Sequence, residues 1–87
     1  FVDPLWFITI EKGTDMDGGV IVNQIRKLRF NENEMTQQEL ADLVGVTRQT
    51  INAIEAAKYS PSLELAFKIS LVFDKPIGEV FKYKIES

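Results

Sequence analysis

The sequence predicts an all-α domain of five helices, with a small two-stranded β element that the chain ends can form. Three observations lead to this prediction. After residue 20, apolar residues recur every three or four positions, as they do on the buried side of a helix. Residues that cap helices stand before three of these segments. Strand-like composition is confined to residues 5–11 and 81–85.

Size and composition limit the function. The chain has 87 residues, enough for a single domain with one modest core. It contains no Cys and no His, which removes disulfides, thiolate metal sites and the commonest general base. No apolar run approaches the ~20 residues that span a bilayer, and no secretory leader is visible. We therefore expect a cytoplasmic protein without a membrane segment, cofactor, metal, evident small-molecule ligand or catalytic residues.

Charge is distributed unevenly along the chain. The net charge is −3, and all of it resides in residues 1–19, because the remainder has as many cations as anions. Turn-forming residues 15–19 separate the two parts. We therefore expect a strand-like extension over residues 1–19 and a neutral domain over 20–87, on which a local basic face can exist.

The N-terminal extension allows two interpretations. Residues 5–11 are aromatic and β-branched, and residues 81–85 alternate apolar with cationic side chains, so the two segments are predicted to pair, within one subunit or across a dimer. A competing hypothesis is that codons for Gly18 and Gly19 form a ribosome-binding sequence. Translation would then start at Val22, and residues 1–21 would be upstream sequence.

The first two helices are predicted from periodicity and caps. Ile21, Ile25 and Leu28 stand at spacings of four and three, which predicts one amphipathic helix. Thr36 and Glu39 form a capping box at the start of the next helix, with Met35 and Leu40 as its hydrophobic staple. Gly45 ends that helix, because Gly enters the left-handed conformation without steric cost.

Three more helices follow. Thr47 is the predicted N-cap of the third, with Ile51 and Ile54 on its buried side and Arg48, Gln49, Asn52 and Ala53 facing outward. Ser62 is expected to cap the fourth, and Pro76 to open a short fifth. The predicted buried residues are Leu63, Ala66, Ile69 and Phe73 in the fourth helix, and Ile77, Val80 and Phe81 in the fifth.

Two short helices joined by a short turn that contains Gly are typical of a helix-turn-helix. Ala41 lets the two helices cross closely, and Ile51 fills the crossing. The second helix then protrudes and can enter the major groove of DNA. The first turn of that helix carries Arg48, Gln49 and Asn52, whose donors and acceptors suit base edges.

The segments 35–41, 44–51, 54–55 and 61–64 together resemble the Cro/CI-type, or XRE, helix-turn-helix family, and the match runs from about Val22 to Phe81. The resemblance implies a lambda-repressor-like bundle of about five helices. It also implies a transcriptional regulator that binds double-stranded DNA, usually as a homodimer on an inverted repeat.

The resemblance also implies roles for single residues. Arg48 and Gln49 would read bases, with Ala53 at a third position; Gln37, Thr47, Thr50 and Lys58 would hold the DNA backbone, and Arg29 would pair with Glu55. Ala56 and Ala57 stand where the family commonly has Gly. Since a left-handed Ala costs ~1 kcal/mol or more, we expect the recognition helix to continue, over about 48–56. The connection from Arg29 to Met35 is one residue longer than usual.

Two rival functions remain at this stage. The same fold could serve as a protein-interaction module, such as a coactivator or an antitoxin-like subunit, with its strand-like ends as docking edges. An enzyme is the weaker rival, because no nucleophile and base are paired. If the protein dimerises, the predicted surface combines the fifth helix with the terminal strands, where Trp6, Phe7, Tyr83 and Ile85 exceed what one small core buries.

Overall fold

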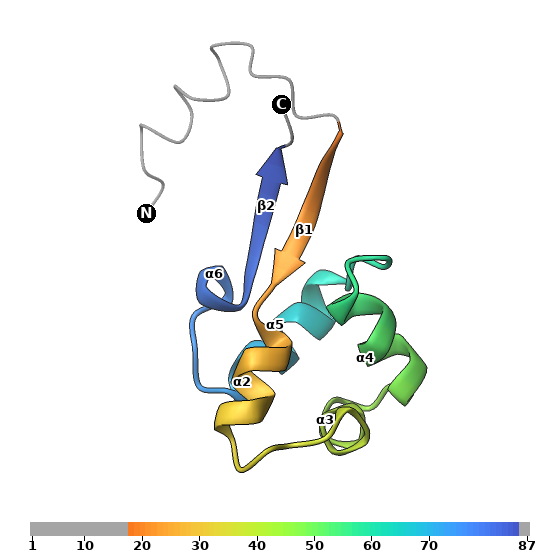
Figure 1. Cartoon of the computed structure of the whole chain (residues 1–87), viewed down its shortest axis with the longest axis vertical. Coiled ribbons are helices and arrows are strands. Elements are labelled where there is room, and N and C mark those ends of the chain that lie inside the picture. The colour runs from red at the N-terminus through yellow and green to blue at the C-terminus, as the bar shows by residue number, and fades with distance from the viewer. Residues whose placement is uncertain (1–17, 86–87) are drawn as a thin grey trace.

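The computed structural model describes residues 18–85. Figure 1 shows a bundle of helices from which two paired strands extend together. This part of the chain forms five helices and one two-stranded sheet, so the predicted fold class is confirmed. The elements in chain order are β1 (Gly19–Asn23), α2 (Ile25–Asn31), α3 (Gln37–Val44), α4 (Arg48–Glu55), α5 (Leu63–Val72), α6 (Ile77–Val80) and β2 (Phe81–Ile85).

The sheet pairs β1 with β2 in antiparallel register, with Gly19 opposite Ile85 and Asn23 opposite Phe81. The strand predicted over residues 81–85 is confirmed as β2. Its predicted partner, residues 5–11, lies outside the described residues, and the strand that pairs with β2 in the structure is β1.

One helix boundary was predicted wrongly. Ile21 was assigned to the first helix but lies in β1, and α2 begins only at Ile25. The reason is local composition, because Val20, Ile21 and Val22 form a β-branched run that favours an extended backbone. Pairing with β2 then supplies the backbone hydrogen bonds of these residues.

The core lies where the helices meet. Its largest fully buried side chains come from five elements and are Ile25, Leu40, Ile51, Ile54, Ile69 and Val80. Burial of these apolar side chains is the main force that holds the short helices in place.

Three predicted core positions differ, and one of them, Ile77, is only half-buried. Leu63 is 69% exposed, and Leu65 is buried in its place. At 100° per residue, Leu65 points almost to the same side as Ile69, four residues later, whereas Leu63 points to another side. Phe81 was predicted inside the fifth helix, but α6 ends at Val80 and Phe81 begins β2, half-buried against the core.

Within residues 18–85, no helix is both long and apolar enough to cross a membrane. The same residues contain no cluster of acidic side chains that could hold a metal ion.

Candidate DNA interface

The first helix of the helix-turn-helix is α3, and residues at its own two ends determine where it begins and ends. The backbone N–H of Glu39 donates to the hydroxyl of Thr36 (3.0 Å), and the N–H of Thr36 donates back to the carboxylate of Glu39 (2.9 Å). The backbone N–H and then the hydroxyl of Thr36 hold the pKa of Glu39 below its ordinary value of 4.5. At the other end, Gly45 adopts φ 78°, and its N–H donates to the carbonyl of Ala41 (2.8 Å).

The turn after Gly45 leads directly into α4. The hydroxyl of Thr47 accepts the backbone N–H of Thr50 (3.2 Å) and lies 3.0 Å from the Thr50 hydroxyl. Ile51 and Ile54 are buried against the bundle. The side of α4 that faces away from the core therefore presents Arg48, Gln49 and Asn52 to solvent.

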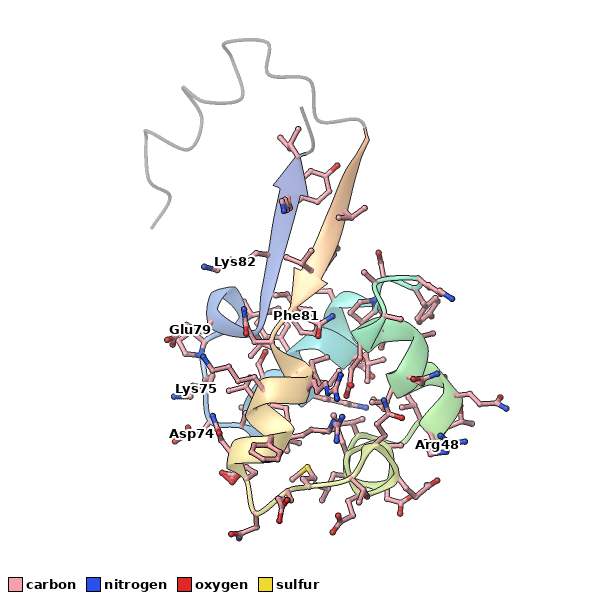
Figure 2. The ribbon with its side chains drawn as sticks, in the orientation of Figure 1. Arg48, Asp74, Lys75, Glu79, Phe81 and Lys82 are labelled. Carbon is pink, nitrogen blue, oxygen red and sulfur yellow. The ribbon has the colours of Figure 1, made fainter. Side chains whose placement is uncertain are left out.

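The orientation of α4 is visible in the figures. Arg48 projects away from the bundle, on the side opposite Asp74, Lys75 and Glu79 (Figure 2). Lys58, the cation that follows α4, is exposed as well. Glu55, the carboxylate of α4, is held by Arg29. The outer side of α4 therefore has an exposed cation near each end, which favours an anionic partner such as DNA.

The C-terminus of α4 corrects another prediction. The helix does not continue through Ala56 but ends at Glu55, and Ala57 adopts the left-handed conformation with φ 58°. One tertiary contact and one local bond explain why this strained conformation persists. The side chain of Asn23 donates from Nδ2 to the carbonyl of Ile54 (2.8 Å), and the backbone N–H of Lys58 donates to the carbonyl of Ala53 (2.9 Å).

The structure contains the ion pair between Arg29 and Glu55. Nε of Arg29 lies 2.6 Å from Oε2 of Glu55, and its terminal Nη2 lies 3.0 Å from Oε1, which makes the pair bidentate. The two side chains are only 14% and 9% exposed. Arg29 also donates to the carbonyl of Met35 (2.7 Å). It therefore connects α2, the loop before α3 and the end of α4.

Gln37 extends this network toward the solvent. Its Nε2 donates to the carboxylate of Glu55 (3.2 Å) and to Oδ1 of Asn52 (3.3 Å). The predicted backbone anchor Gln37 and the predicted base reader Asn52 are therefore in contact, and both are connected to the ion pair. Such a network restricts the orientation of the outer side of α4 relative to α3.

Most of the remaining predicted site residues lie together. Thr47, Gln49, Thr50 and Ala53 line one shallow hollow on the surface of α4, and Tyr59 completes it. Sequence reasoning assigned no DNA contact to Tyr59, which is 53% exposed. An aromatic residue with a polar hydroxyl in the loop after α4 is a signal that could have placed it beside this hollow. Asn23 was missed too, because no local pattern connects it to Ile54.

This geometry defines a helix-turn-helix protein, and comparison with known proteins agrees. A family model described as helix-turn-helix matches residues 25–80. The chain belongs to this family of transcriptional regulators, and the resemblance to Cro/CI-type proteins is confirmed.

Relatives of this chain are named as transcriptional regulators. An uncharacterised helix-turn-helix-type transcriptional regulator of Methanocaldococcus jannaschii is 48% identical over 71% of this chain and 92% of its own length. Another from Archaeoglobus fulgidus is 48% identical over 72% of this chain and 87% of its own length. The transcriptional repressor RstR of a cryptic phage in Vibrio cholerae is 36% identical over 67% of this chain and 51% of its own length.

A solved structure shows the same fold. A candidate DNA-binding protein from Bacteroides fragilis superimposes with a TM-score of 0.62 over 71% of this chain and 98% of its own, at 22% sequence identity.

Proposed function

We propose that this protein is a sequence-specific DNA-binding regulator that binds an inverted repeat as a homodimer, with α4 in the major groove. The observation that carries the proposal is the two-sided character of α4. Its inner side is buried through Ile51 and Ile54, and its outer side exposes Arg48, Gln49 and Asn52. A protruding helix with such side chains fits the width of the major groove.

The outer side of α4 suggests which residues read bases. Arg48 can donate two hydrogen bonds to O6 and N7 of guanine, and Gln49 can pair bidentately with N6 and N7 of adenine. Asn52 can also reach a base edge, with Gln37 restraining its amide. Ala53 offers a small apolar surface, which suits a thymine methyl group.

A second set of residues would hold the DNA backbone. Thr47 and Thr50 lie at the start of α4, and Gln37 lies beside it at the start of α3. Lys58 and Tyr59 follow α4 and are exposed. Contacts from these residues to phosphates would position α4 without reading sequence.

A homodimer in the cytoplasm is part of the proposal. One recognition helix touches only a few base pairs, which gives too little discrimination in a genome. A two-fold dimer adds a second half-site about one helical turn away, ~34 Å from centre to centre.

Selection from a library of randomised DNA duplexes tests this function. Wild-type protein is mixed with the library, and bound duplexes are separated by electrophoretic shift and sequenced. We expect an enriched inverted repeat and binding that weakens steeply with salt. Absence of any shift at low salt would overturn the proposal and favour the protein-interaction module.

A further inference from the structure

An apolar stripe runs along the outer side of α5. Leu63, Phe67 and Leu71 follow one another at intervals of four residues, so they lie on one side of the helix. They are 69%, 49% and 78% exposed, respectively. The opposite side of the same helix is buried through Leu65 and Ile69. Helix α5 is therefore apolar on two sides, and only one of them contributes to the core of the described chain.

The stripe continues onto α3. Leu43, in the last turn of α3, is 62% exposed. A shallow hollow of about 550 Å³ separates the end of α3 from α5, and its lining includes Leu43, Leu71 and Val72 together with the charged residues Asp42 and Lys68. We call Leu43, Leu63, Phe67 and Leu71 the α5 face. None of these residues belongs to the candidate DNA interface, and a contiguous apolar surface of this kind marks a protein contact.

Charges beside the stripe indicate what covers it. Glu64 and Lys68 flank the α5 face and form an exposed pair at 3.2 Å (81% and 51% exposed side chains). If a second α5 packs antiparallel across a two-fold axis near Phe67, the same flank of each helix meets. Glu64 of one copy then lies near Lys68 of the other, and the reverse pair forms by symmetry. The charges of this face thus complement a second copy of the same chain.

The same arrangement fills the hollow. With the axis near Phe67, Leu63 of one copy lies opposite Leu71 of the other, next to the hollow between α3 and α5. Each copy inserts one Leu beside Leu43 of its partner, and the two Phe67 rings meet at the centre. An isologous interface requires such self-complementarity, because the same patch of each copy must both insert a Leu into the partner and accommodate the Leu of the partner.

We propose that the homodimer forms through antiparallel packing of the α5 faces of two copies. This inference rests on the proposed function, since it names the surface behind the proposed dimer. It replaces the surface expected from the sequence, which combined the fifth helix with the terminal strands. Tyr83 and Ile85 on β2 are 47% and 38% exposed, less than any residue of the α5 face.

Substitution at the edge of the face gives the first test. Leu71→Lys changes an exposed side chain in the free subunit, so folding should be retained and circular dichroism melting checks this. Sedimentation equilibrium should show self-association weakened about a hundredfold or more, because two copies each lose a buried apolar contact and bury a charge instead.

Two matched variants identify the surface. Phe30→Lys replaces a comparably exposed apolar residue of α2 (67%) and should leave association unchanged. Ile85→Lys probes the terminal strands in the same way. Loss of association in Ile85→Lys, with normal association in Leu71→Lys, would overturn the proposal and restore the surface expected from the sequence.

A charge exchange tests the antiparallel register. Glu64→Lys places two cations on the flank, and Lys68→Glu places two anions there, so each variant alone should associate weakly. An equimolar mixture should form heterodimers at least about tenfold more tightly than either variant forms homodimers, because every contact between copies is then opposite in charge. Mixing leaves the interactions within each chain unchanged. No gain on mixing would contradict the proposed register.

DNA binding separates this inference from the proposed function. Leu71→Lys should still bind a single half-site with the wild-type base preference, while losing its preference for the inverted repeat. Failure of the wild-type protein to select any sequence would refute the proposed function, whatever the oligomeric state. A wild-type protein that selects a sequence but stays monomeric at micromolar concentration, free and on DNA, would refute the α5 dimer and the homodimer of the proposed function, but would leave sequence-specific DNA binding by α4 in place.

Discussion

The two helices of the helix-turn-helix have equal length but are held in different ways. In α3, the start and the end are each defined by residues of the helix or its caps, namely the Thr36–Glu39 box and Gly45. In α4, the start is defined locally by Thr47, and the end combines a local bond from the N–H of Lys58 to the carbonyl of Ala53 with contacts from distant residues. The distant residues are Asn23 and Arg29, which precede the end of α4 by more than 25 residues. The position of α4 is therefore set partly by tertiary contacts from β1 and α2.

This difference predicts that α4 is most sensitive to loss of the ion pair. Arg29→Met should lower the free energy of unfolding by about 3 kcal/mol, because Glu55 and the Met35 carbonyl are left without their partner in a poorly hydrated site. Urea unfolding measures the effect. Arg29→Met combined with Glu55→Met should lose less than Arg29→Met alone, since no buried charge is left unpaired. A loss under about 0.5 kcal/mol in the single variant would show that the pair does not hold α4.

Asn23 should have the next largest effect. It donates to the carbonyl of Ile54 and accepts the backbone N–H of Ile25 (3.1 Å), so it joins the end of α4 to the start of α2. Asn23→Ala should lower stability by about 1–2 kcal/mol. Gln24→Ala, at the exposed adjacent position, is the control and should stay within about 0.5 kcal/mol of wild type. Equal losses in the two variants would argue against a specific role for Asn23.

The C-terminal ends of α3 and α4 also differ in the residue that adopts the left-handed conformation, which is Gly45 after α3 and Ala57 after α4. Gly45→Ala should destabilise the protein by about 1 kcal/mol through backbone strain alone, because a Cβ there meets no atom within 4 Å. Ala57→Gly should stabilise it by up to about 1 kcal/mol by relieving the strain at φ 58°. Thermal melting of both variants measures these shifts. A fall in Tm for Ala57→Gly would mean that the flexibility of Gly in the unfolded chain outweighs the strain.

The smallest expected effect is the pH dependence of the stability that the Thr36–Glu39 capping box of α3 contributes. The folded-state pKa of Glu39 is lowered, so the ionised carboxylate stabilises the fold above 4.5, and this contribution is lost as the pH falls below that value. The difference in Tm between wild type and Glu39→Gln should therefore shrink as the pH is lowered through 4.5. A difference that is constant between pH 7 and pH 3 would contradict this role.

The same contrast explains what the sequence could predict. The boundaries of α3 and the start of α4 follow from Thr36, Gly45 and Thr47, because caps act within one turn of helix. The end of α4 was predicted too late, since the contact from Asn23 to Ile54 has no local signature. Ile21 was misassigned because its spacing to Ile25 fits a helix, while the β-branched run around it pairs with β2.

The candidate site shows the same limits. The residues that face outward on α4 follow from helical periodicity once Ile51 and Ile54 are recognised as core. The pair of Arg29 with Glu55 was expected from the family resemblance and is present in the structure. The hydrogen bond from Gln37 to Asn52 depends on how α3 packs against α4. The position of Tyr59 beside the α4 hollow depends on how the loop after α4 packs. Neither arrangement is encoded by a single segment of the sequence.

The most direct test of the account compares the proposed base-reading residues with the proposed backbone-holding residues, on the DNA selected by the wild-type protein. Binding to a randomised library is measured at two salt concentrations for four variants, Arg48→Ala, Gln49→Ala, Lys58→Ala and Thr47→Ala. Arg48→Ala and Gln49→Ala should each cost ~1–3 kcal/mol on the preferred site and relax one base position. Lys58→Ala should weaken all sequences alike and lower the salt slope by about one, and Thr47→Ala should lose ~1 kcal/mol of stability with unchanged preference. Wild-type sequence preference in both Arg48→Ala and Gln49→Ala would contradict the assignment of α4 as the recognition helix.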